Sequence, residues 1–224
     1  MEYLFSLLEH ITLTDVFNLA LILIGFSVVW PCFLALIKFV YINFIRKPKD
    51  LAKLYGKGSW ALITGCTSGI GQSMSEQLAA KGFNIILCSR STDRLEKEAK
   101  RLKLRFPSLE TKIVQADFSE GNELALYERI LKEVEELDIS ILVNNAGVNY
   151  RGKFDDVATA QLLEMTIVNT YPYVLLTKAL YKKLANRPKN QRSVVVNVAS
   201  GLGMFPSPFD GAYSATKAFE IYFS

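Results

Sequence analysis

The sequence predicts an α/β protein in which a doubly wound parallel sheet follows an N-terminal transmembrane helix. From residue 57 onward, short apolar runs typical of buried strands alternate with amphipathic helical segments. A glycine-rich loop joins the first of these strands to the first helix. Upstream lies one long apolar run, and half of the 224 residues are hydrophobic, so the mean hydropathy of +0.18 is high for a soluble protein.

The apolar run extends from Phe17 to Ile37 without a charged residue, which is enough to span a hydrocarbon layer about 30 Å thick. A buried core helix is the alternative, but such a helix rarely lacks a polar face over this length. Pro31 lies within the run, and apolar residues resume after Lys38. One long tilted helix and a helix with a second shallow segment therefore both fit. We predict a membrane anchor within residues 1–45.

The charges on the two sides of this anchor predict its orientation. Residues 1–15 carry acidic side chains and no lysine or arginine, which argues against a secretory signal peptide. Basic side chains follow the run at Lys38, Arg46, Lys47, Lys49, Lys53 and Lys57. Because basic flanks stay in the cytosol, residues 1–15 are expected across the membrane. A basic linker at 46–56 and a cytosolic domain at 57–224 complete the predicted organisation.

Composition excludes several classes of function. The net charge of +4 comes largely from the basic flank, and it predicts contact with lipid headgroups. Nucleic-acid binding is not expected, because no basic stripe with interleaved aromatic residues continues into the domain. The cysteines lack the spacing of a metal or redox site and are expected to be free thiols; they are Cys32, Cys66 and Cys88. The sole histidine, His10, precedes the predicted anchor, which excludes a Ser-His-Asp hydrolase and a histidine-rich metal site within these residues.

The domain is predicted as alternating strands and helices. The strands are expected at 60–64, 84–88, 111–116, 139–144 and 193–198. The helices are expected at 72–81, 92–106, 123–137, 159–183 and 210–224, with an interruption of the fourth at Pro172. Because the strands are continuously apolar, they are expected to be buried on both faces of a parallel sheet that has helices on either side.

The residues beyond the strand ends favour a dinucleotide site, because open parallel sheets bind ligands there. The loop after the first strand has small residues that let the backbone approach a pyrophosphate, and the helix that begins near Ile70 offers free N–H groups to it. The predicted contacts are Gly65, Thr67, Ser68, Gly69, Ile70 and Gly71. Arg90 follows the second strand and suits a 2′-phosphate, so NADP is favoured over NAD; an exposed surface arginine is the alternative. Asp117 follows the third strand, where it is placed to accept hydrogen bonds from an adenine amino group.

The fourth strand ends in the sequence Asn144-Asn145-Ala146-Gly147. Two consecutive asparagines at a buried strand end need hydrogen-bond partners for both amides. We therefore expect them to tie neighbouring strands together beside the cofactor.

The last helix carries Tyr213 and Lys217, four residues apart and hence on one face. A cation beside a phenol favours the phenolate and makes the tyrosine a better proton donor and acceptor near neutral pH. Ser200 follows the fifth strand and is placed to add a hydrogen bond to the same reacting oxygen. An ordinary aromatic and basic pair on a helix is the alternative when these residues are considered alone.

Taken together, residues 57–224 resemble the short-chain dehydrogenase/reductase family, a Rossmann-type fold. The resemblance rests on motifs in order and in register: Thr64-Gly-x-x-x-Gly-x-Gly71, Asn144-Asn-Ala-Gly147, Asn169, Ser200 and Tyr213-x-x-x-Lys217. The N-terminal membrane segment, the Ser89-Arg90 pair and Ala215–Phe219 most resemble the branch of membrane-bound very-long-chain 3-oxoacyl-CoA reductases and 17β-hydroxysteroid dehydrogenases.

The resemblance implies a ketone reductase that uses NADP(H), with catalytic roles for Ser200, Tyr213, Lys217 and Asn169. Tyr213 would donate a proton to the carbonyl oxygen and Ser200 would hydrogen-bond it. Lys217 would lower the pKa of Tyr213 and hold the nicotinamide ribose, and Asn169 would keep a water that links Lys217 to solvent. Asn145, Ala146 and Gly147 would line the cofactor side.

The implied substrate is hydrophobic and presented at a membrane, with the endoplasmic reticulum as the implied location. A 3-oxoacyl-CoA, a 17-ketosteroid and a retinoid all suit the anchor, and a homo-oligomer is an open alternative for assembly. The contrary hypothesis is a non-catalytic anchored protein. In this family the last helix continues and further strands follow, so residues 193–198 would form a bare hydrophobic edge. We expect the 224-residue chain to be a fragment with its last strands missing.

Overall fold

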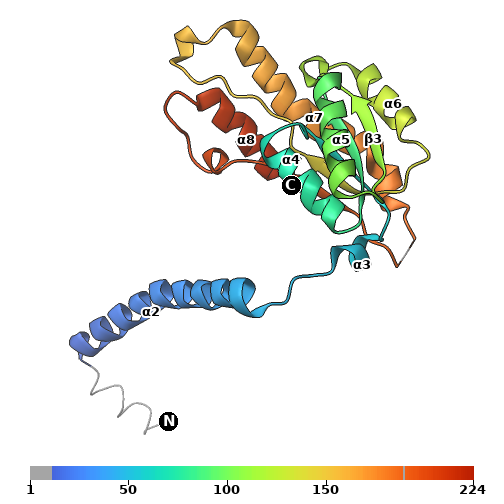
Figure 1. The fold of residues 1–224 in the computed structure, drawn as a ribbon. Coiled ribbons are helices and arrows are strands. Elements are labelled where there is room, and N and C mark those ends of the chain that lie inside the picture. Colours follow the sequence, from blue (N-terminus) through green and yellow to red (C-terminus); the bar gives the residue numbers. More distant parts are fainter. Residues whose placement is uncertain (1–11, 189) are drawn as a thin grey trace. The chain divides into compact units, whose positions relative to one another are not determined.

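The computed structural model describes residues 12–188 and 190–224 and divides the chain into two compact units, Met1–Lys49 and Asp50–Ser224. The first unit holds helix α2 (Leu13–Val40), which continues into a π-helical turn, η1 (Tyr41–Ile45) (Figure 1). The predicted placement of residues 1–11 across the membrane, His10 included, concerns positions outside the described residues.

Helix α2 is continuous through the whole predicted span. Thr12 caps its start, since the Thr12 hydroxyl accepts from the Asp15 backbone N–H at 3.2 Å and the Asp15 carboxylate accepts from the Thr12 N–H at 2.9 Å. Pro31 lies inside the helix. Among the described residues, Leu13–Ile45 is the one helical stretch long and apolar enough to cross a membrane, with a mean hydropathy of 2.5. Of the two predicted forms, the structure has the single long helix.

The second unit begins with a short helix, α3 (Leu51–Tyr55), within the predicted linker. The Asp50 carboxylate caps it by accepting from the Lys53 N–H at 3.1 Å. Leu51 and Tyr55 pack against the core, so this part of the basic segment belongs to the folded domain.

The domain is built on a five-stranded parallel sheet in the order β3-β2-β1-β4-β5, which confirms the predicted doubly wound fold. Its strands are β1 (Trp60–Thr64), β2 (Asn84–Ser89), β3 (Thr111–Gln115), β4 (Ile139–Asn144) and β5 (Val194–Asn197). The ends align, because Thr64 of β1 pairs with Cys88 of β2, and Asn144 of β4 pairs with Asn197 of β5. The residues that follow the strands therefore meet at one edge.

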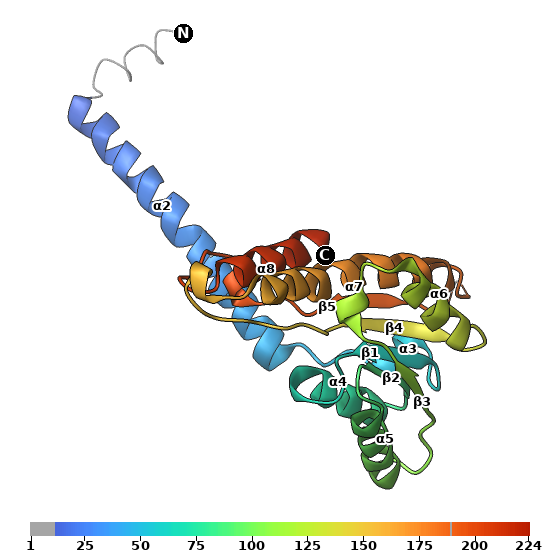
Figure 2. The ribbon, with the colours of Figure 1, turned by 90° about the horizontal axis from the view of Figure 1, so that it is seen from above.

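Helices cover both faces of this sheet (Figure 2). Helices α4 (Gly69–Ala80) and α5 (Thr92–Arg105) lie on one face, and α6 (Leu124–Glu133) and α7 (Thr159–Ala185) lie on the other. Helix α8 (Gly211–Phe223) packs against α7. The predicted interruption at Pro172 is wrong: the proline lies buried inside a continuous α7, and packing of α7 on β4 and α6 offsets the missing backbone hydrogen bond.

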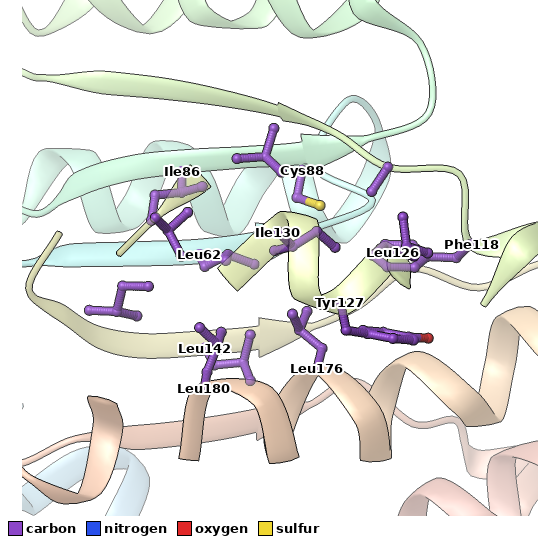
Figure 3. Packing of buried hydrophobic residues seen from close by; sticks show 14 of the residues in the cluster. Leu62, Ile86, Cys88, Phe118, Leu126, Tyr127, Ile130, Leu142, Leu176 and Leu180 are labelled. Carbon is purple, nitrogen blue, oxygen red and sulfur yellow. The ribbon is translucent and has the colours of Figure 1, made fainter. Parts of the chain in front are cut away.

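Two apolar cores fill the spaces between the layers. On one face, Leu62, Ile86 and Leu142 from the sheet meet Ile130 of α6 and the α7 leucines at 176 and 180 (Figure 3). On the other face, Ile63, Ile85 and Val143 meet residues of α4 and α5. Strand β5 differs from the prediction of burial on both faces: all four of its residues are half-buried, because β5 is the edge strand of the described sheet.

Candidate active site

A cleft of about 560 Å³ lies at the carboxyl edge of the sheet. Its walls come from the segments after β1, β2, β3 and β4, where parallel sheets bind ligands. Ten residues predicted to bind cofactor line it: Gly65, Thr67, Ser68, Gly69, Ile70, Arg90, Asp117, Asn145, Ala146 and Gly147. The structure thus brings together residues that are far apart in the sequence, while Gly71, Tyr213 and Lys217 lie outside the lining.

The loop after β1 needs glycine at two positions. Gly65 has a positive φ of 63°, and a Cβ there would lie 3.0 Å from the Ala146 Cα. A Cβ on Gly71 would lie 2.5 Å from both the Asn145 Nδ2 and the Gly65 carbonyl oxygen. Gly71 is therefore required for close packing of α4 beneath the loop, which explains why it does not line the cleft. Ser68 precedes α4 without capping it through its side chain, so the first N–H groups of α4 remain available to an anion.

Replacing Gly71 with alanine is expected to destabilise the domain by about 1–3 kcal/mol, because the added methyl overlaps backbone atoms. Gly211 is a matched control: it also lies in the first turn of a helix, and a Cβ there meets no atom within 4 Å. Thermal unfolding of the full chain should show a lower Tm for Gly71→Ala and little change for Gly211→Ala. Equal Tm values for the two variants would contradict the close packing.

The two asparagines at the end of β4 tie neighbouring strands together, as the sequence predicts. The Asn144 Nδ2 donates to the Asn197 Oδ1 of β5 at 2.9 Å and to the Thr177 hydroxyl of α7 at 3.1 Å. The Asn145 Nδ2 donates to the Thr64 carbonyl of β1 at 2.9 Å, and the Asn145 N–H donates to the Thr64 hydroxyl at 2.8 Å. These hydrogen bonds hold the wall of the cleft in place, and they all run to neighbouring strands or to α7.

One end of the cleft carries two arginines. Arg90, just after β2, and Arg94, in the first turns of α5, are both exposed, and both line the cleft. Asp117, which follows β3, carries the opposite charge to these arginines. Its Oδ1 accepts from the Ser119 N–H at 3.0 Å and from the Ser119 hydroxyl at 2.9 Å. Asp117 therefore shapes its own turn. The paired cations make this end of the cleft suitable for a phosphate.

Asn169 is a buried link between α7, α8 and the segment after β4, and its side chain is 0% exposed. Its Oδ1 accepts from the Val148 N–H at 2.9 Å, while its Nδ2 donates to the Val148 carbonyl and to the Thr216 hydroxyl, both at 3.0 Å. A helix-surface amide is thereby excluded. A Cβ on Gly147 would lie 3.3 Å from the Asn169 Oδ1 and 3.4 Å from the Lys217 Nζ, so these three residues converge beside the cleft wall.

Lys217 has a partner that the sequence analysis did not identify. Its Nζ donates to the two carboxylate oxygens of Glu220 at 2.8 and 2.9 Å and to the Val198 carbonyl at 3.3 Å. The ammonium lies 5.5 Å from the centroid of the Tyr213 ring. The spacing of Tyr213 and Lys217 on one face of α8 is thus as predicted, but the ammonium is engaged by a carboxylate.

The pKa of Tyr213 is raised above its ordinary value, which is opposite to the predicted effect of Lys217. Burial is the main cause, and the negative charges of Glu220 and Asp210 add to it, whereas a hydrogen bond from Ser200 acts in the other direction. The predicted lowering of the Tyr213 pKa assumed an unpaired ammonium, and Glu220 offsets that charge. At neutral pH Tyr213 is therefore protonated.

A second cleft, of about 340 Å³, has Tyr213 in its lining. Apolar side chains dominate its lining: Phe154, Val157, Leu162, Met165 and Phe209. Asp210 secures the start of α8 here, since it accepts from the Asn149 Nδ2 at 3.1 Å and lies 3.4 Å from the Arg151 Nε. An apolar molecule in this cleft would lie against Tyr213 at the start of α8.

Sequence reasoning missed Arg94, Thr216 and Glu220. Arg94 had a usable signal, since it lies four residues after Arg90 at the start of a helix. Glu220 also had one, because it is an acid three residues after Lys217 in an otherwise apolar stretch. The apolar cleft had no such signal, because its walls come from α7, α8 and two loops that meet only in the folded chain.

Residues 59–224 match the family model described as short chain dehydrogenase. The chain is 35% identical over 193 residues to the very-long-chain 3-oxoacyl-CoA reductase of Podospora anserina, covering 85% of this chain and 56% of that protein. It is 34% identical over 214 residues to human 17-beta-hydroxysteroid dehydrogenase type 3, covering 94% of this chain and 67% of that protein. The chain spans about half the length of the reductases of this kind that it matches.

Solved structures with NADPH are similar to the domain. A short-chain dehydrogenase from Sphingobium yanoikuyae in complex with NADPH shares 31% identity at a TM-score of 0.66, covering 74% of this chain and 62% of that chain. L-sorbose reductase from Gluconobacter frateurii, complexed with NADPH and L-sorbose, shares 26% identity at a TM-score of 0.68, covering 77% of this chain and 64% of that chain.

Proposed function

Because the chain belongs to the short-chain dehydrogenase family, we propose that it reduces a ketone on a hydrophobic substrate, with NADPH as the source of hydride. The observation that best supports this is the meeting of two sets of residues at one edge of the sheet. A cleft with a glycine loop and two arginines lies beside the buried side chains of Asn169 and Lys217, and the half-buried Tyr213 ring is 5.5 Å from the Lys217 Nζ.

The first cleft has features that suit a dinucleotide phosphate. Gly65 and Gly147 leave room that a Cβ would fill, and the N-terminus of α4 offers unpaired N–H groups for a pyrophosphate. Arg90 and Arg94 would hold the 2′-phosphate, and Asp117, Asn145, Ala146 and Ile70 would line the adenosine and ribose. When bound, NADPH would supply the hydride that the carbonyl carbon accepts.

The proton for the carbonyl oxygen would come from Tyr213 of α8, with Ser200, Lys217 and Asn169 in supporting roles. Tyr213, whose raised pKa keeps it protonated, would donate its hydroxyl proton to the carbonyl oxygen, and Ser200 would donate a hydrogen bond to the same oxygen. Lys217 would bind the nicotinamide ribose. Asn169 would hold the water through which Lys217 is connected to solvent, as the family resemblance implies.

The substrate would enter the apolar cleft beside Tyr213 from a membrane surface. The names of the most similar relatives favour a 3-oxoacyl-CoA or a 17-ketosteroid, and the apolar walls of the cleft also suit a retinoid. Helix α2 would anchor the chain in the endoplasmic reticulum, and the basic flank would keep the domain in the cytosol. A homo-oligomer is compatible with this arrangement.

The function is tested by titrating NADPH into the full chain in lipid vesicles and then supplying one ketone from each class. We expect cofactor fluorescence to report binding, and at least one ketone to be consumed together with NADPH. A folded chain that neither binds NADPH nor reduces any of these ketones would support the alternative of a non-catalytic anchored protein.

Cofactor choice is expected to depend on Arg90. Its replacement with alanine removes a charge-assisted contact to phosphate, so NADPH affinity should fall about tenfold to a hundredfold while NADH affinity stays nearly unchanged. Arg94→Ala should act in the same direction. Arg105 lies farther along α5, outside the cleft lining and paired with Glu76, so Arg105→Ala is the control. Equal weakening of NADPH and NADH by Arg90→Ala would count against the phosphate contact.

A further inference from the structure

Glu220 is a fully buried carboxylate, 0% exposed, one turn after Lys217 on α8. Its two oxygens lie 2.8 and 2.9 Å from the Lys217 Nζ, and Lys217 itself is 5% exposed. An apolar side chain of similar volume would fill this site without the desolvation that a buried ion pair requires. Stability of the helix therefore does not explain why a carboxylate lies here.

Two tyrosine rings and one backbone carbonyl surround this ion pair. The Tyr173 ring of α7 has its centroid 5.8 Å from the Lys217 Nζ, and the Tyr173 hydroxyl donates to the Val198 carbonyl at 3.1 Å. Tyr173 also lowers the pKa of Glu220. Tyr213 lies one turn before Lys217 on α8. Glu220 is thus faced by one ammonium and two phenols, and the ammonium is fixed by the oxygens of Glu220 and Val198.

We propose that Glu220 is a positioning residue whose carboxylate fixes the Lys217 ammonium beside Asn169 and offsets the positive charge that Tyr213 would otherwise experience. The proposal deepens the proposed function and rests on it for its effect on turnover. In this arrangement Lys217 contributes a hydrogen-bond donor at a fixed position. The effect of its positive charge on the pKa of Tyr213 depends on whether Glu220 is charged.

Protonation of Glu220 then changes Tyr213 near neutral pH. Burial raises the pKa of Glu220 to about 7, against the opposing effect of Lys217. Above that pH the carboxylate is charged and the pKa of Tyr213 stays high; below it the carboxylate is neutral, the ammonium is no longer offset, and Tyr213 loses its proton more readily. Glu220 would therefore keep the proton donor protonated at the alkaline side of neutrality.

The test is a titration of Tyr213 that requires no turnover. The full chain with ¹³Cζ-labelled tyrosine is titrated by NMR in detergent micelles, and Tyr213→Phe identifies the resonance. Glu220→Gln keeps the shape and removes the charge, so the pKa of Tyr213 should fall by about one unit. Glu220→Asp keeps the charge, so the pKa of Tyr213 in that variant should stay close to the wild-type value. An unchanged Tyr213 pKa in Glu220→Gln, or an equal fall in both variants, would overturn the proposal.

Glu98 provides the matched control. It is also a buried carboxylate paired with a cation, Arg101 at 2.7 Å, but it lies on α5, outside the site. Glu98→Gln should leave the pKa of Tyr213 unchanged. If a general loss of packing were the cause, the pKa of Tyr213 would change in both Glu98→Gln and Glu220→Gln. In ketone reduction, activity falls as Tyr213 loses its proton, so Glu220→Gln should move that fall to lower pH by the same shift. A chain with no turnover but a shifted titration would refute the proposed function and leave the coupling intact.

If Glu220→Gln does not fold, the proposal is tested by NMR titration of the wild-type chain. The ¹³Cδ resonance of Glu220 should titrate near pH 7, and the Tyr213 resonance should respond in the same step. A Tyr213 resonance that does not respond while the Glu220 carboxyl titrates, at whatever pH that occurs, would overturn the proposal.

Discussion

Replacing Tyr213 with phenylalanine is expected to lower ketone reduction by about 10²–10⁴-fold, the usual contribution of a positioned general acid. The hydroxyl is the group that would protonate the carbonyl oxygen, and phenylalanine has no proton to donate. Tyr213 lines the apolar cleft and lies outside the lining of the dinucleotide cleft, so NADPH affinity should remain nearly unchanged. Parallel measurements of kcat and of NADPH binding by fluorescence check both statements.

Tyr222→Phe is the control for this substitution. Tyr222 lies on the same helix and is 90% exposed, so its loss should affect neither quantity. Turnover in Tyr213→Phe within a few fold of wild type would remove the tyrosine from its proposed role.

Replacing Lys217 with methionine is expected to have the next largest effect, because it acts on stability and on chemistry together. The change leaves the Glu220 carboxylate buried without its cation, which should lower the free energy of unfolding by about 3 kcal/mol. The loss should be greater at pH 8 than at pH 6, since the raised pKa of Glu220 lets it become neutral at the lower pH. Chemical unfolding at the two pH values measures this difference.

The double variant separates the two effects. Adding Glu220→Leu to Lys217→Met replaces the ion pair by two apolar side chains, which should restore most of the stability. Turnover should stay low, because the ribose contact and the fixed donor are still missing. Recovery of turnover together with stability would show that Lys217 has only a structural role.

The sequence alone was sufficient for the fold because the strands are short, apolar and separated by glycine or proline signals. The run Trp60–Thr64 followed by a glycine loop and a helix fixes the first βαβ unit, and the asparagines at 144 and 145 could be assigned to strand ends from their need for partners. Both assignments depend on local sequence, and both are confirmed by the hydrogen bonds.

The parts that could not be predicted depend on contacts between distant segments. Whether Lys217 faces Tyr213 as a free cation or is paired depends on the burial of Glu220 against α7, which spacing on one helix does not reveal. Pro172 lies within an unbroken helix because tertiary packing overrides its local preference. The half-burial of β5 is set by its position at the edge of the sheet, not by its apolar composition.

We propose that Tyr213 and a bound NADPH act on one carbonyl group at the carboxyl edge of the sheet. The most direct measurement is isotope transfer: the full chain in lipid vesicles is given NADPH deuterated at the reactive carbon, together with a long-chain 3-oxoacyl-CoA, a 17-ketosteroid or a retinoid. We predict an alcohol that carries deuterium at the former carbonyl carbon, and none when Tyr213 is phenylalanine. A folded chain that transfers no deuterium to any of these ketones, or that transfers it equally well in Tyr213→Phe, would contradict the account.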